Sequence, residues 1–508
     1  MKILLVYPQY PETFWSFSHA LKFISKKAAF PPLGLLTVAA MLPDDWAKKL
    51  VDMNTTPLTD ADIRWADYVF ISAMVVQKSS VQEVIARCNR LGAKIVAGGP
   101  LFTTGHEEFA GVDHFVLGEA EAALPPFLED LNKGCAQPIY TSDERPDISR
   151  TPIPQWSLIN MKHYSAMSLQ YSRGCPYDCE FCDIIVLNGH APRTKSPSQI
   201  VNELEALYNH GWRGGVFVVD DNFIGNKRKL KAETLPAIIE WMKEKKYPYI
   251  FFTEASINLA DDEERMRLMI EAEFNRVFIG IESPNEESLA ECNKIQNKDR
   301  DLAASVKKLQ NRGFEVQGGF IIGFDSDPVS IFRSQINFIQ KSGIVTAMVG
   351  LLNAPRQTRL YQRLNKENRL LQTMSGDNTD FSINFIPKMN YETLINGYRQ
   401  VLNTIYSPRQ YYERVRVFLR EYKPRQRTMT RITQVKFQYI SAFFKSLWFL
   451  GIREKGRRYY WRLLFATLFR HPRSFPLSVI LSVYGFHFRK ITEKFARVPV
   501  EDPPRSGQ

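Results

Sequence analysis

The stretch Tyr171-Ser-Arg-Gly-Cys-Pro-Tyr-Asp-Cys-Glu-Phe-Cys182 governs the interpretation of this 508-residue sequence. It sets Cys175, Cys179 and Cys182 in a C-x₃-C-x₂-C spacing. Three thiolates on one short loop can bind three irons of a cubane cluster and leave the fourth iron open. No fourth cysteine lies nearby in the sequence to complete the set. A cluster with an open iron carries out chemistry, whereas one with four protein ligands mostly carries electrons.

A structural zinc site with His190 as fourth ligand is an alternative for the same cysteines. Their spacing differs from the usual C-x₂-C zinc knuckles, so we favour iron and sulfur. The remaining cysteines, Cys88, Cys135 and Cys292, show no pairing pattern. Such cysteine usage argues against a disulfide framework and favours a reducing, cytoplasmic compartment.

The length and the 44% hydrophobic content allow two to four domains of about 150 residues each. No stretch reaches the roughly 18 uncharged apolar residues of a membrane span. The net charge of +12 is concentrated in residues 401–508, which hold 22 Lys and Arg against 6 Asp and Glu. The basic character therefore belongs to one segment.

Residues 1–135 alternate short apolar runs with helical patterns. The runs are residues 3–7, 49–53, 68–74, 94–97 and 114–117. This rhythm predicts a doubly wound, Rossmann-like parallel sheet. Gly98 and Gly99 follow the fourth run and Gly118 the fifth, at carboxyl ends where open α/β sheets bind ligands. Glycine there either admits a bulky cofactor or makes a tight turn, and the sequence alone favours neither.

A proline-rich connector, residues 136–165, precedes a second series of strands and helices in residues 166–352. Its strands are predicted at 168–172, 215–219, 249–253, 276–281, 316–322 and 345–351. Six βα units predict a partial (β/α)₆ barrel, open on one side, with its site at the carboxyl ends of the strands. The three cysteines follow the first of these strands.

Polar residues end the next strands of this series. Asp220, Asp221 and Asn222 close the second, Glu254 the third and Glu282 the fourth. Carboxylates and amides at one edge suit a ligand that carries an ammonium group and a ribose. Gly323-Phe324-Asp325 follows the fifth strand in the same way. Helix N-capping by Asp221, Asn222 or Ser283 is the structural alternative, although four such strand ends at one edge favour a site.

The cysteine motif on a six-unit partial barrel, with Phe181 before the last cysteine, resembles the radical S-adenosylmethionine (SAM) enzymes. The first domain, with Pro31-Pro-Leu-Gly-Leu-Leu36 and Gly98-Gly-Pro100, is similar to their cobalamin-binding (class B) subgroup. The residues after the barrel, 353–508, resemble those of hopanoid C-2 methylase-like members. The implied organisation is a cobalamin domain (1–135), a linker (136–165), a radical SAM barrel (166–352) and a basic, mostly helical region (353–508).

The resemblance implies a [4Fe-4S] cluster on the three cysteines, with SAM chelating its open iron. The implied SAM contacts are Phe181 for adenine, Asp220, Asp221 and Asn222 for the amino group, and Glu254 and Glu282 for ribose and methionine. Gly98, Gly99 and Gly118 would face cobalamin. The implied reaction uses a 5′-deoxyadenosyl radical and methylcobalamin to methylate an unactivated carbon of a lipid-like or secondary-metabolite substrate. The reducing electron would come from a donor such as flavodoxin or ferredoxin.

One departure from the family concerns cobalt. Members that ligate cobalt through histidine carry Asp-x-His-x-x-Gly after the first strand. Here that segment is Tyr7-Pro-Gln-Tyr-Pro-Glu-Thr-Phe-Trp15, without histidine. Cobalamin binding without a protein ligand to cobalt is compatible with this segment, and we interpret His19, His106 and His114 as ordinary polar or core histidines in preference to cobalt ligands.

The basic segment 401–508 interleaves Arg and Lys with large aromatic residues. Three interpretations stay open: a helical lid on the barrel, helices lying on the inner face of a membrane, and nucleic acid binding. Its apolar bulk exceeds what a phosphate-reading surface needs, so nucleic acid is the least favoured.

Two other functions are weighed against a methylase. A tRNA-modifying methylthiotransferase would need a second three-cysteine cluster in its first domain, where only Cys88 and Cys135 occur. An electron-transfer or cobalamin-sensing module would have no use for an open iron beside a polar edge. A cobalamin-dependent radical SAM methylase is the favoured interpretation.

Overall fold

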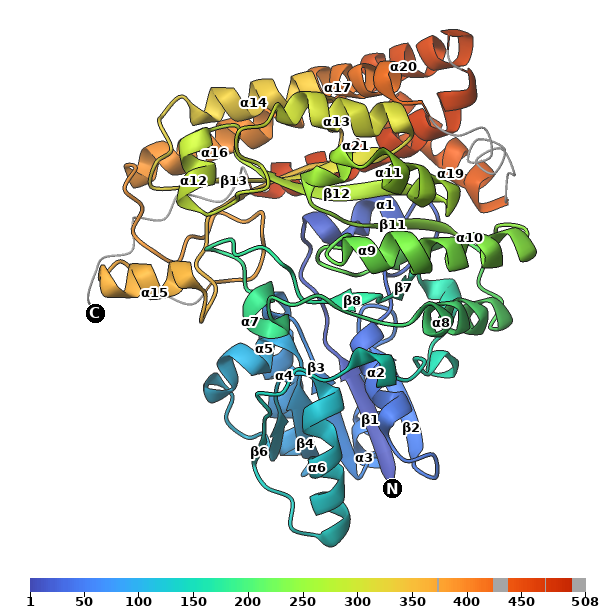
Figure 1. Ribbon diagram of the computed structural model, residues 1–508, viewed down its shortest axis with the longest axis vertical. Helices are drawn as coiled ribbons and strands as arrows, with labels where there is room; N and C mark the ends of the chain where they lie inside the picture. The colour runs from blue at the N-terminus through green and yellow to red at the C-terminus, as the bar shows by residue number, and fades with distance from the viewer. Residues whose placement is uncertain (372–373, 424–436, 471, 496–508) are drawn as a thin grey trace.

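The computed structural model describes residues 1–371, 374–423, 437–470 and 472–495. Figure 1 shows a doubly wound domain at the bottom, a second sheet with its helices above it, and the C-terminal helices at the top. The parts of the basic segment at 424–436, 471 and 496–508 lie outside the described residues. The mixed α/β architecture with a helical C-terminal region is as predicted.

The first sheet is parallel, with strand order β2-β1-β3-β4-β5-β6. Its strands are β1 (Lys2–Tyr7), β2 (Ala47–Asp52), β3 (Tyr68–Ser72), β4 (Lys94–Gly98), β5 (His114–Val116) and β6 (Ile139–Tyr140). Alternate residues of β1 face opposite sides: Leu4 packs with α3 (Asp60–Trp65), α4 (Lys78–Arg90) and α5 (Pro100–Gly105), whereas Ile3 packs with α2 (Leu33–Met41) and α6 (Ala120–Lys133). The sequence did not predict β6, which extends this sheet beyond residue 135.

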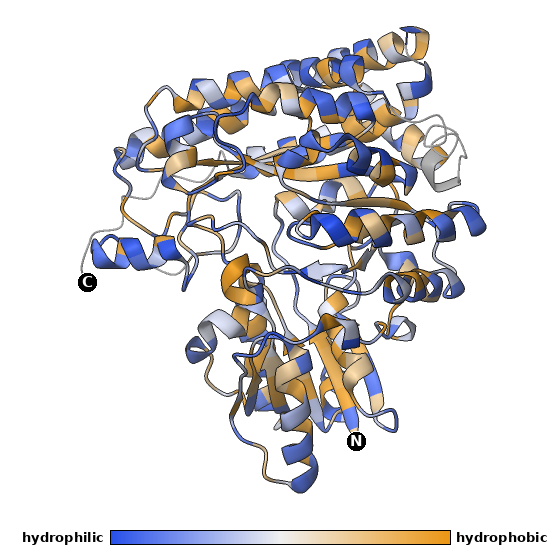
Figure 2. Ribbon diagram, in the orientation of Figure 1, coloured by the Kyte–Doolittle hydropathy of each residue, from blue (hydrophilic) through white to orange (hydrophobic). Residues whose placement is uncertain are grey.

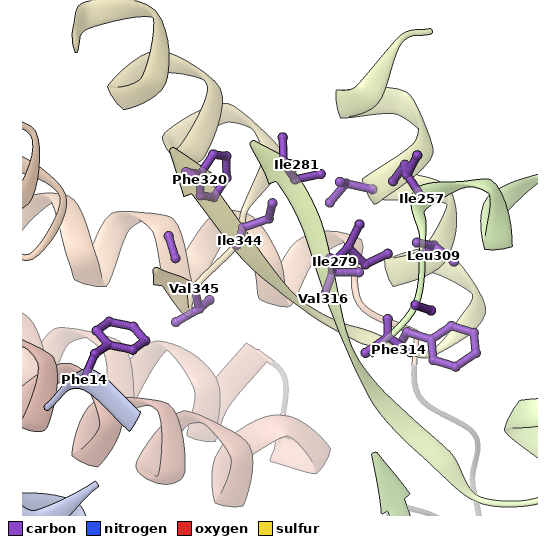
Figure 3. Close-up of a cluster of buried hydrophobic side chains, with 14 of the residues drawn as sticks. Phe14, Ile257, Ile279, Ile281, Leu309, Phe314, Val316, Phe320, Ile344 and Val345 are labelled. Carbon is purple, nitrogen blue, oxygen red and sulfur yellow. The ribbon is translucent and has the colours of Figure 1, made fainter. Parts of the chain in front are cut away.

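The second sheet is also parallel and has the order β14-β13-β12-β11-β10-β7. Its strands are β7 (Ala166–Leu169), β10 (Gly215–Val218), β11 (Ile250–Glu254), β12 (Phe274–Glu282), β13 (Glu315–Ile322) and β14 (Ala347–Leu351). The main outer helices are α8 (Pro197–Asn209), α10 (Leu235–Glu244), α11 (Glu263–Glu271), α13 (Leu302–Arg312) and α14 (Ile331–Ser342). Figure 3 shows part of the core, where Ile279 and Val316 of the strands meet Leu309 of α13.

The strand order leaves β7 and β14 as edges, and other parts of the chain bond to each of them. The backbone at Ala28 forms a parallel bridge with Tyr164, just before β7. At the other edge, the hydroxyls of Tyr398 and Tyr406 donate hydrogen bonds to the carbonyl oxygens of Val349 (2.9 Å) and Ala347 (2.7 Å). The tyrosine contacts come from α16 (Tyr391–Ile405) or its C-terminal cap, so the C-terminal region protects an edge that would otherwise pair with other chains.

Two segments from opposite ends of the sequence, η1 (Phe14–Ser16) and α21 (Phe475–Phe495), pack together beside the second sheet. The ring of Phe14 in η1 stacks on Phe488 of α21 at 4.2 Å between centroids. His487 is fully buried and its Nε2 donates to the carbonyl oxygen of Phe14 at 2.9 Å. Burial lowers the pKa of His487 to about 4, which keeps the ring neutral. Trp15 packs edge-on against Phe278 of β12.

The remaining C-terminal helices are α17 (Pro408–Glu421), α19 (Phe437–Trp448), the π-helical turn η9 (Phe449–Arg453) and α20 (Arg457–Arg470). Arg414 of α17 is fully buried and donates to Gln340 Oε1 (2.7 Å) and to the carbonyl oxygen of Ile405 (2.8 Å). These bonds fix α17 to α14 and α16. Among the described residues, no helix combines the length and apolarity needed to cross a bilayer.

Gly397 tests how closely α16 packs on the barrel. A Cβ atom at this position would lie 2.2 Å from the ring of Phe332 in α14. Gly397→Ala should therefore lower the free energy of unfolding by about 1–3 kcal/mol through overpacking. Gly34→Ala in α2 is the matched control, because nothing lies within 4 Å of its Cβ position, and it should be neutral or slightly stabilising. Thermal unfolding of both variants checks this, and an unchanged Gly397→Ala midpoint would contradict the packing.

Candidate active site

The three cysteines lie on a loop held closed by backbone contacts. The short antiparallel pair β8 (Ser172–Arg173) and β9 (Arg193–Thr194) forms the base of this loop. The Cys175 amide donates to the carbonyl oxygen of Gly189 at 3.2 Å. Gly174 has φ +94°, and a Cβ there would lie 2.8 Å from the carbonyl oxygen of Ala191, so only glycine allows this closure. Helix α7 (Ile184–Asn188) begins two residues after the last cysteine.

Polar groups surround the thiols. The side-chain amide of Asn222 lies 3.8 Å from Cys175 Sγ, and that of Gln296 lies 3.9 Å from Cys179 Sγ. Lys294 is a cation close to the cysteines, where its charge opposes the rise in the pKa of Cys179 that burial causes. These donors and this cation offset part of the effect of burial, which still raises the pKa of Cys179 above its ordinary value.

The cysteines do not form a site for a single ion. Within the described ranges, no three His, Cys, Asp or Glu side chains could together hold one metal ion, and His190 is exposed. The zinc alternative thus gains no support from this part of the chain. Cys292, distant in sequence, is buried near Cys179 and its thiol contacts the carbonyl oxygen of Leu289 at 3.7 Å.

Asp220 faces the cysteine loop itself. Its carboxylate is fully buried and accepts hydrogen bonds from the amides of Tyr171 (2.7 Å) and Ser172 (2.6 Å) and from the Ser172 hydroxyl (2.5 Å). Burial raises its pKa to about 7 despite these bonds. Asp220 therefore positions the strand that leads into the first cysteine.

Glu254 and Asp221 form the acidic part of the predicted polar edge. Among the described residues, none donates a hydrogen bond to the Glu254 carboxylate, and burial together with Asp221 raises the pKa of Glu254 to about 8. Burial and the neighbouring Asp183 raise the pKa of Asp221 to about 6, and its one side-chain contact is Asn188 at 3.5 Å. Two carboxyl groups with so few protein partners are suited to accept hydrogen bonds from a bound ligand.

Glu282 and Phe181 have protein partners. Glu282 ends β12 at φ +61° and pairs with Lys294 at 2.6 Å, and the absence of a side chain at Gly280 leaves room for this pair. The pair holds the pKa of Lys294 above its ordinary value although burial alone would lower it. The half-buried ring of Phe181 lies 6.3 Å from that of Phe324. Neither Asp221 nor Asn222 caps a helix, so the capping alternative is wrong for both.

A buried charge network joins the cysteine loop to the first sheet. Glu119, directly after Gly118, accepts from Arg173 at 2.8 Å and from Arg193 at 2.7 Å. Arg173 also pairs with Glu121 at 2.8 Å, which outweighs burial and lowers the pKa of Glu121 to about 2. Both arginines belong to the β8–β9 pair, so the carboxyl edge of the first sheet holds the base of the cysteine loop.

A third arginine extends this network to the helix after the cysteines. Arg145 of the connector lies 3.7 Å from Glu119 and donates to the carbonyl oxygen of Val186 in α7 at 2.8 Å. No role for this network was predicted from the sequence, although Arg173 lies in the cysteine motif and Glu119 directly follows Gly118. Their positions in the cysteine motif and next to Gly118 were the sequence features that could have pointed to the network.

The three glycines at the carboxyl edge differ in their surroundings. A Cβ at Gly98 would lie 2.7 Å from the carbonyl oxygen of Val116, and one at Gly99 would lie 2.4 Å from Ser72 Oγ. Both therefore serve close packing within the sheet. Gly118 has φ +81°, and the nearest atom to its Cβ position is 3.8 Å away.

A cavity of about 430 Å³ lies beside this edge. Lys78, Leu101 and Thr104 of the first domain line it, together with Asp183 after the last cysteine and Arg356 after β14. Glu108 bridges Lys78 and Arg356 across it. Another hollow, of about 390 Å³, lies against the outer helices α11 and α13, away from the strand ends. The first cavity is the one that adjoins both the cysteine loop and the first sheet.

Comparison with known families matches each region of the chain. Residues 169–333 match the Radical SAM superfamily, residues 24–128 the B12 binding domain, and residues 358–499 a domain of unknown function, DUF4070. In fold the chain is similar to OxsB, a cobalamin-dependent S-adenosylmethionine radical enzyme, with a TM-score of 0.62, 14% identity and coverage of 98% of this chain and 80% of OxsB. It is also similar to the methyltransferase TsrM of Kitasatospora setae, with a TM-score of 0.57, 15% identity and coverage of 73% and 79%.

Two relatives match almost the whole length. An uncharacterized methyltransferase of Synechocystis sp. is 41% identical over 497 residues, which cover 97% of this chain and 92% of the relative. The hopanoid C-2 methylase of Rhodopseudomonas palustris is 32% identical over 480 residues, covering 92% and 90%. The chain belongs to the cobalamin-binding radical SAM enzymes, whose cofactors are a [4Fe-4S] cluster, S-adenosylmethionine and cobalamin.

Proposed function

We propose that this enzyme transfers a methyl group to an unactivated carbon of a lipid-like substrate. The observation that carries the proposal is the Glu119 network, which joins the cysteine loop to the carboxyl edge of the first sheet through Arg173 and Arg193. Such a connection keeps a cofactor of the first domain (1–135) and one of the barrel (166–352) at a common edge, with 136–165 as their linker. The lipid-like substrate is inferred from the relative named hopanoid C-2 methylase.

Cys175, Cys179 and Cys182 would hold the iron–sulfur cluster. Their surroundings fit an anionic metal cluster, because Asn222 and Gln296 offer amide N–H groups to sulfur and Lys294 adds a positive charge. Asp220 acts as a positioning residue for the first cysteine through the backbone of residues 171–172.

Glu254 and Asp221 would receive SAM. Each carboxyl group is half-buried and has few protein partners, which fits a ligand with ammonium and hydroxyl donors. Glu282 would contact SAM only together with Lys294, its ion-pair partner, and Phe181 would lie against adenine. The cavity beside Leu101 and Thr104 would accept part of cobalamin, with Gly118 as the more open of the glycine contacts.

When bound, these cofactors supply a radical that removes a hydrogen atom from the substrate and a methyl group that replaces it. The protein orients them and excludes water from the edge between its two sheets. A donor such as flavodoxin or ferredoxin would supply the electron, in the cytoplasm. We also propose that residues 401–508 contact the inner face of the membrane.

Removing a proposed cluster ligand tests the chemistry. Cys179→Ala should lose iron after anaerobic reconstitution, and with reductant, SAM and methylcobalamin it should form neither 5′-deoxyadenosine nor S-adenosylhomocysteine. Mass spectrometry quantifies both products. Cys135→Ala is the control, because Cys135 is exposed on the first domain and should keep both products. If the unaltered enzyme formed 5′-deoxyadenosine but no S-adenosylhomocysteine, this result would contradict methyl transfer.

Glu254 should make the stability of the cofactor-free enzyme depend on pH. Its pKa is about 8 when folded against an ordinary value of 4.5, so the folded state retains a proton that the unfolded chain loses. The wild type should therefore lose stability as pH rises from about 4.5 to about 8. Glu254→Gln should be the more stable protein at pH 8, by on the order of 1 kcal/mol or more. Thermal unfolding at pH 5 and pH 8 measures this, with exposed Glu240→Gln as the control.

Glu119→Gln should weaken the connection between the two sheets. Loss of this buried charge leaves Arg173 and Arg193 short of a partner, at a cost of about 3 kcal/mol. We expect faster proteolysis within residues 136–165 and less 5′-deoxyadenosine per bound cluster. Glu129→Gln, which alters an exposed pair with Lys133, should change neither. Unaltered proteolysis and yield in Glu119→Gln would show that the network does not hold the domains together.

A further inference from the structure

The C-terminal helices carry a surface of exposed apolar side chains. On α19 and η9 these are Ile440, Phe444, Trp448, Phe449 and Ile452, and on α20 they are Phe465, Leu468 and Phe469. We call this set the apolar face. Phe469 is 79% exposed, Phe444 63% and Trp448 54%. Single exposed apolar residues are ordinary, but eight on neighbouring helical segments mark an interaction surface.

The exposed residues form two stripes that meet. Ile440, Phe444, Trp448 and Ile452 recur at every fourth position, so they share one side of that segment, and Phe449 lies next to Trp448. On α20, Phe465 and Phe469 are also four apart. Trp461 connects the stripes, because its ring stacks on Phe465 at 5.7 Å and its N–H donates to the carbonyl oxygen of Gly451 at 2.9 Å.

The helices that carry the apolar face are fixed to each other and to the protein. Ser446 and Tyr460, both buried, share a hydrogen bond of 2.8 Å between α19 and α20. Lys445 Nζ donates to the carbonyl oxygen of Lys22 at 3.1 Å. The face is therefore presented by a packed structure and does not require a partner in order to form.

Positive charge surrounds the apolar face. Residues 437–474 contain eight Lys and Arg residues but a single acidic residue, Glu454. Glu454 is paired with Arg489 (2.7 Å) and Lys490 (3.5 Å), so it offsets little of this charge. The exposed cations are Arg453, Lys455, Arg457, Arg458, Arg462, Arg470 and Arg473. Figure 2 shows hydrophilic and hydrophobic residues interleaved along α20.

We propose that the apolar face binds the surface of an anionic lipid bilayer. Trp448 and the phenylalanines would enter the boundary between headgroups and acyl chains, while the flanking arginines contact lipid phosphate. A nucleic acid would use the cations but leave most of the aliphatic and phenyl surface exposed to water. The inference deepens the proposed function, since it rests on a lipid-like substrate being reached at a membrane, but binding to lipid is measured without turnover.

Cosedimentation with vesicles tests the proposal on the full-length enzyme. The probes are vesicles of phosphatidylcholine alone and of phosphatidylcholine with phosphatidylglycerol. We expect binding to the anionic vesicles that weakens with added salt. Trp448→Ser combined with Phe465→Ser and Phe469→Ser should reduce the partition constant about tenfold or more. Arg457→Gln combined with Arg458→Gln and Arg462→Gln should reduce it mainly at low salt.

A matched triple variant controls for a general loss of apolar surface. Ile139→Ser, Ile153→Ser and Val329→Ser alter residues that are 48%, 40% and 66% exposed elsewhere on the molecule, and should leave vesicle binding intact. Thermal unfolding verifies that each variant is folded. The proposal is overturned if the wild type ignores anionic vesicles, or if the apolar-face variant binds them as well as the control does. Loss of self-association in that variant, without any vesicle binding, would assign the face to a second copy of the chain instead.

Discussion

A six-stranded parallel sheet that does not close has two edges, and this enzyme depends on how they are covered. Parallel strands need both faces and both edges satisfied, because unpaired backbone groups attract other strands. Here the backbone at Ala28 and Ala29 bonds to residues 164–166 at the start of β7, and the hydroxyls of Tyr398 and Tyr406 bond to two carbonyl oxygens of β14. The first domain and the C-terminal helices are therefore structural parts of the barrel as well as neighbours of it.

The cysteine loop also depends on contacts with other parts of the chain, here through buried charged groups. Asp220 holds its entry from inside the barrel, and Glu119 holds its base from the first sheet. A buried carboxylate is stable only when donors surround it, and these two carboxylates find their donors in the backbone of the loop and in Arg173 and Arg193. The loop is thus determined by two domains at once, which explains why a short segment with little regular structure can have a defined shape.

The sequence was sufficient for the strands and for the position of the cysteines, because both follow from local patterns. Apolar runs located eleven of the twelve strands in the two large sheets, and only the two-residue β6 was missed. The roles of single polar residues were harder to infer. Asp220 and Glu282 occupy the predicted edge, yet the side chain of each is bonded to another part of the protein. Glu254 has few such protein partners. Whether such a carboxylate bonds to the protein or stays available to a ligand depends on groups such as Lys294 and Ser172. These groups come close only in the folded structure, so local sequence patterns do not reveal them.

The stacking of Phe14 on Phe488 has a consequence for how the enzyme is made. The two rings are separated by more than 470 residues, and the neutral, buried His487 forms part of the same contact. Synthesis proceeds from the amino terminus, so the first domain and all strands of the barrel emerge from the ribosome before this contact can exist. During that interval Phe14 and its neighbours lack the partners that α21 provides. The amino-terminal segment therefore reaches its final packing only after the last helix of the described chain has been made.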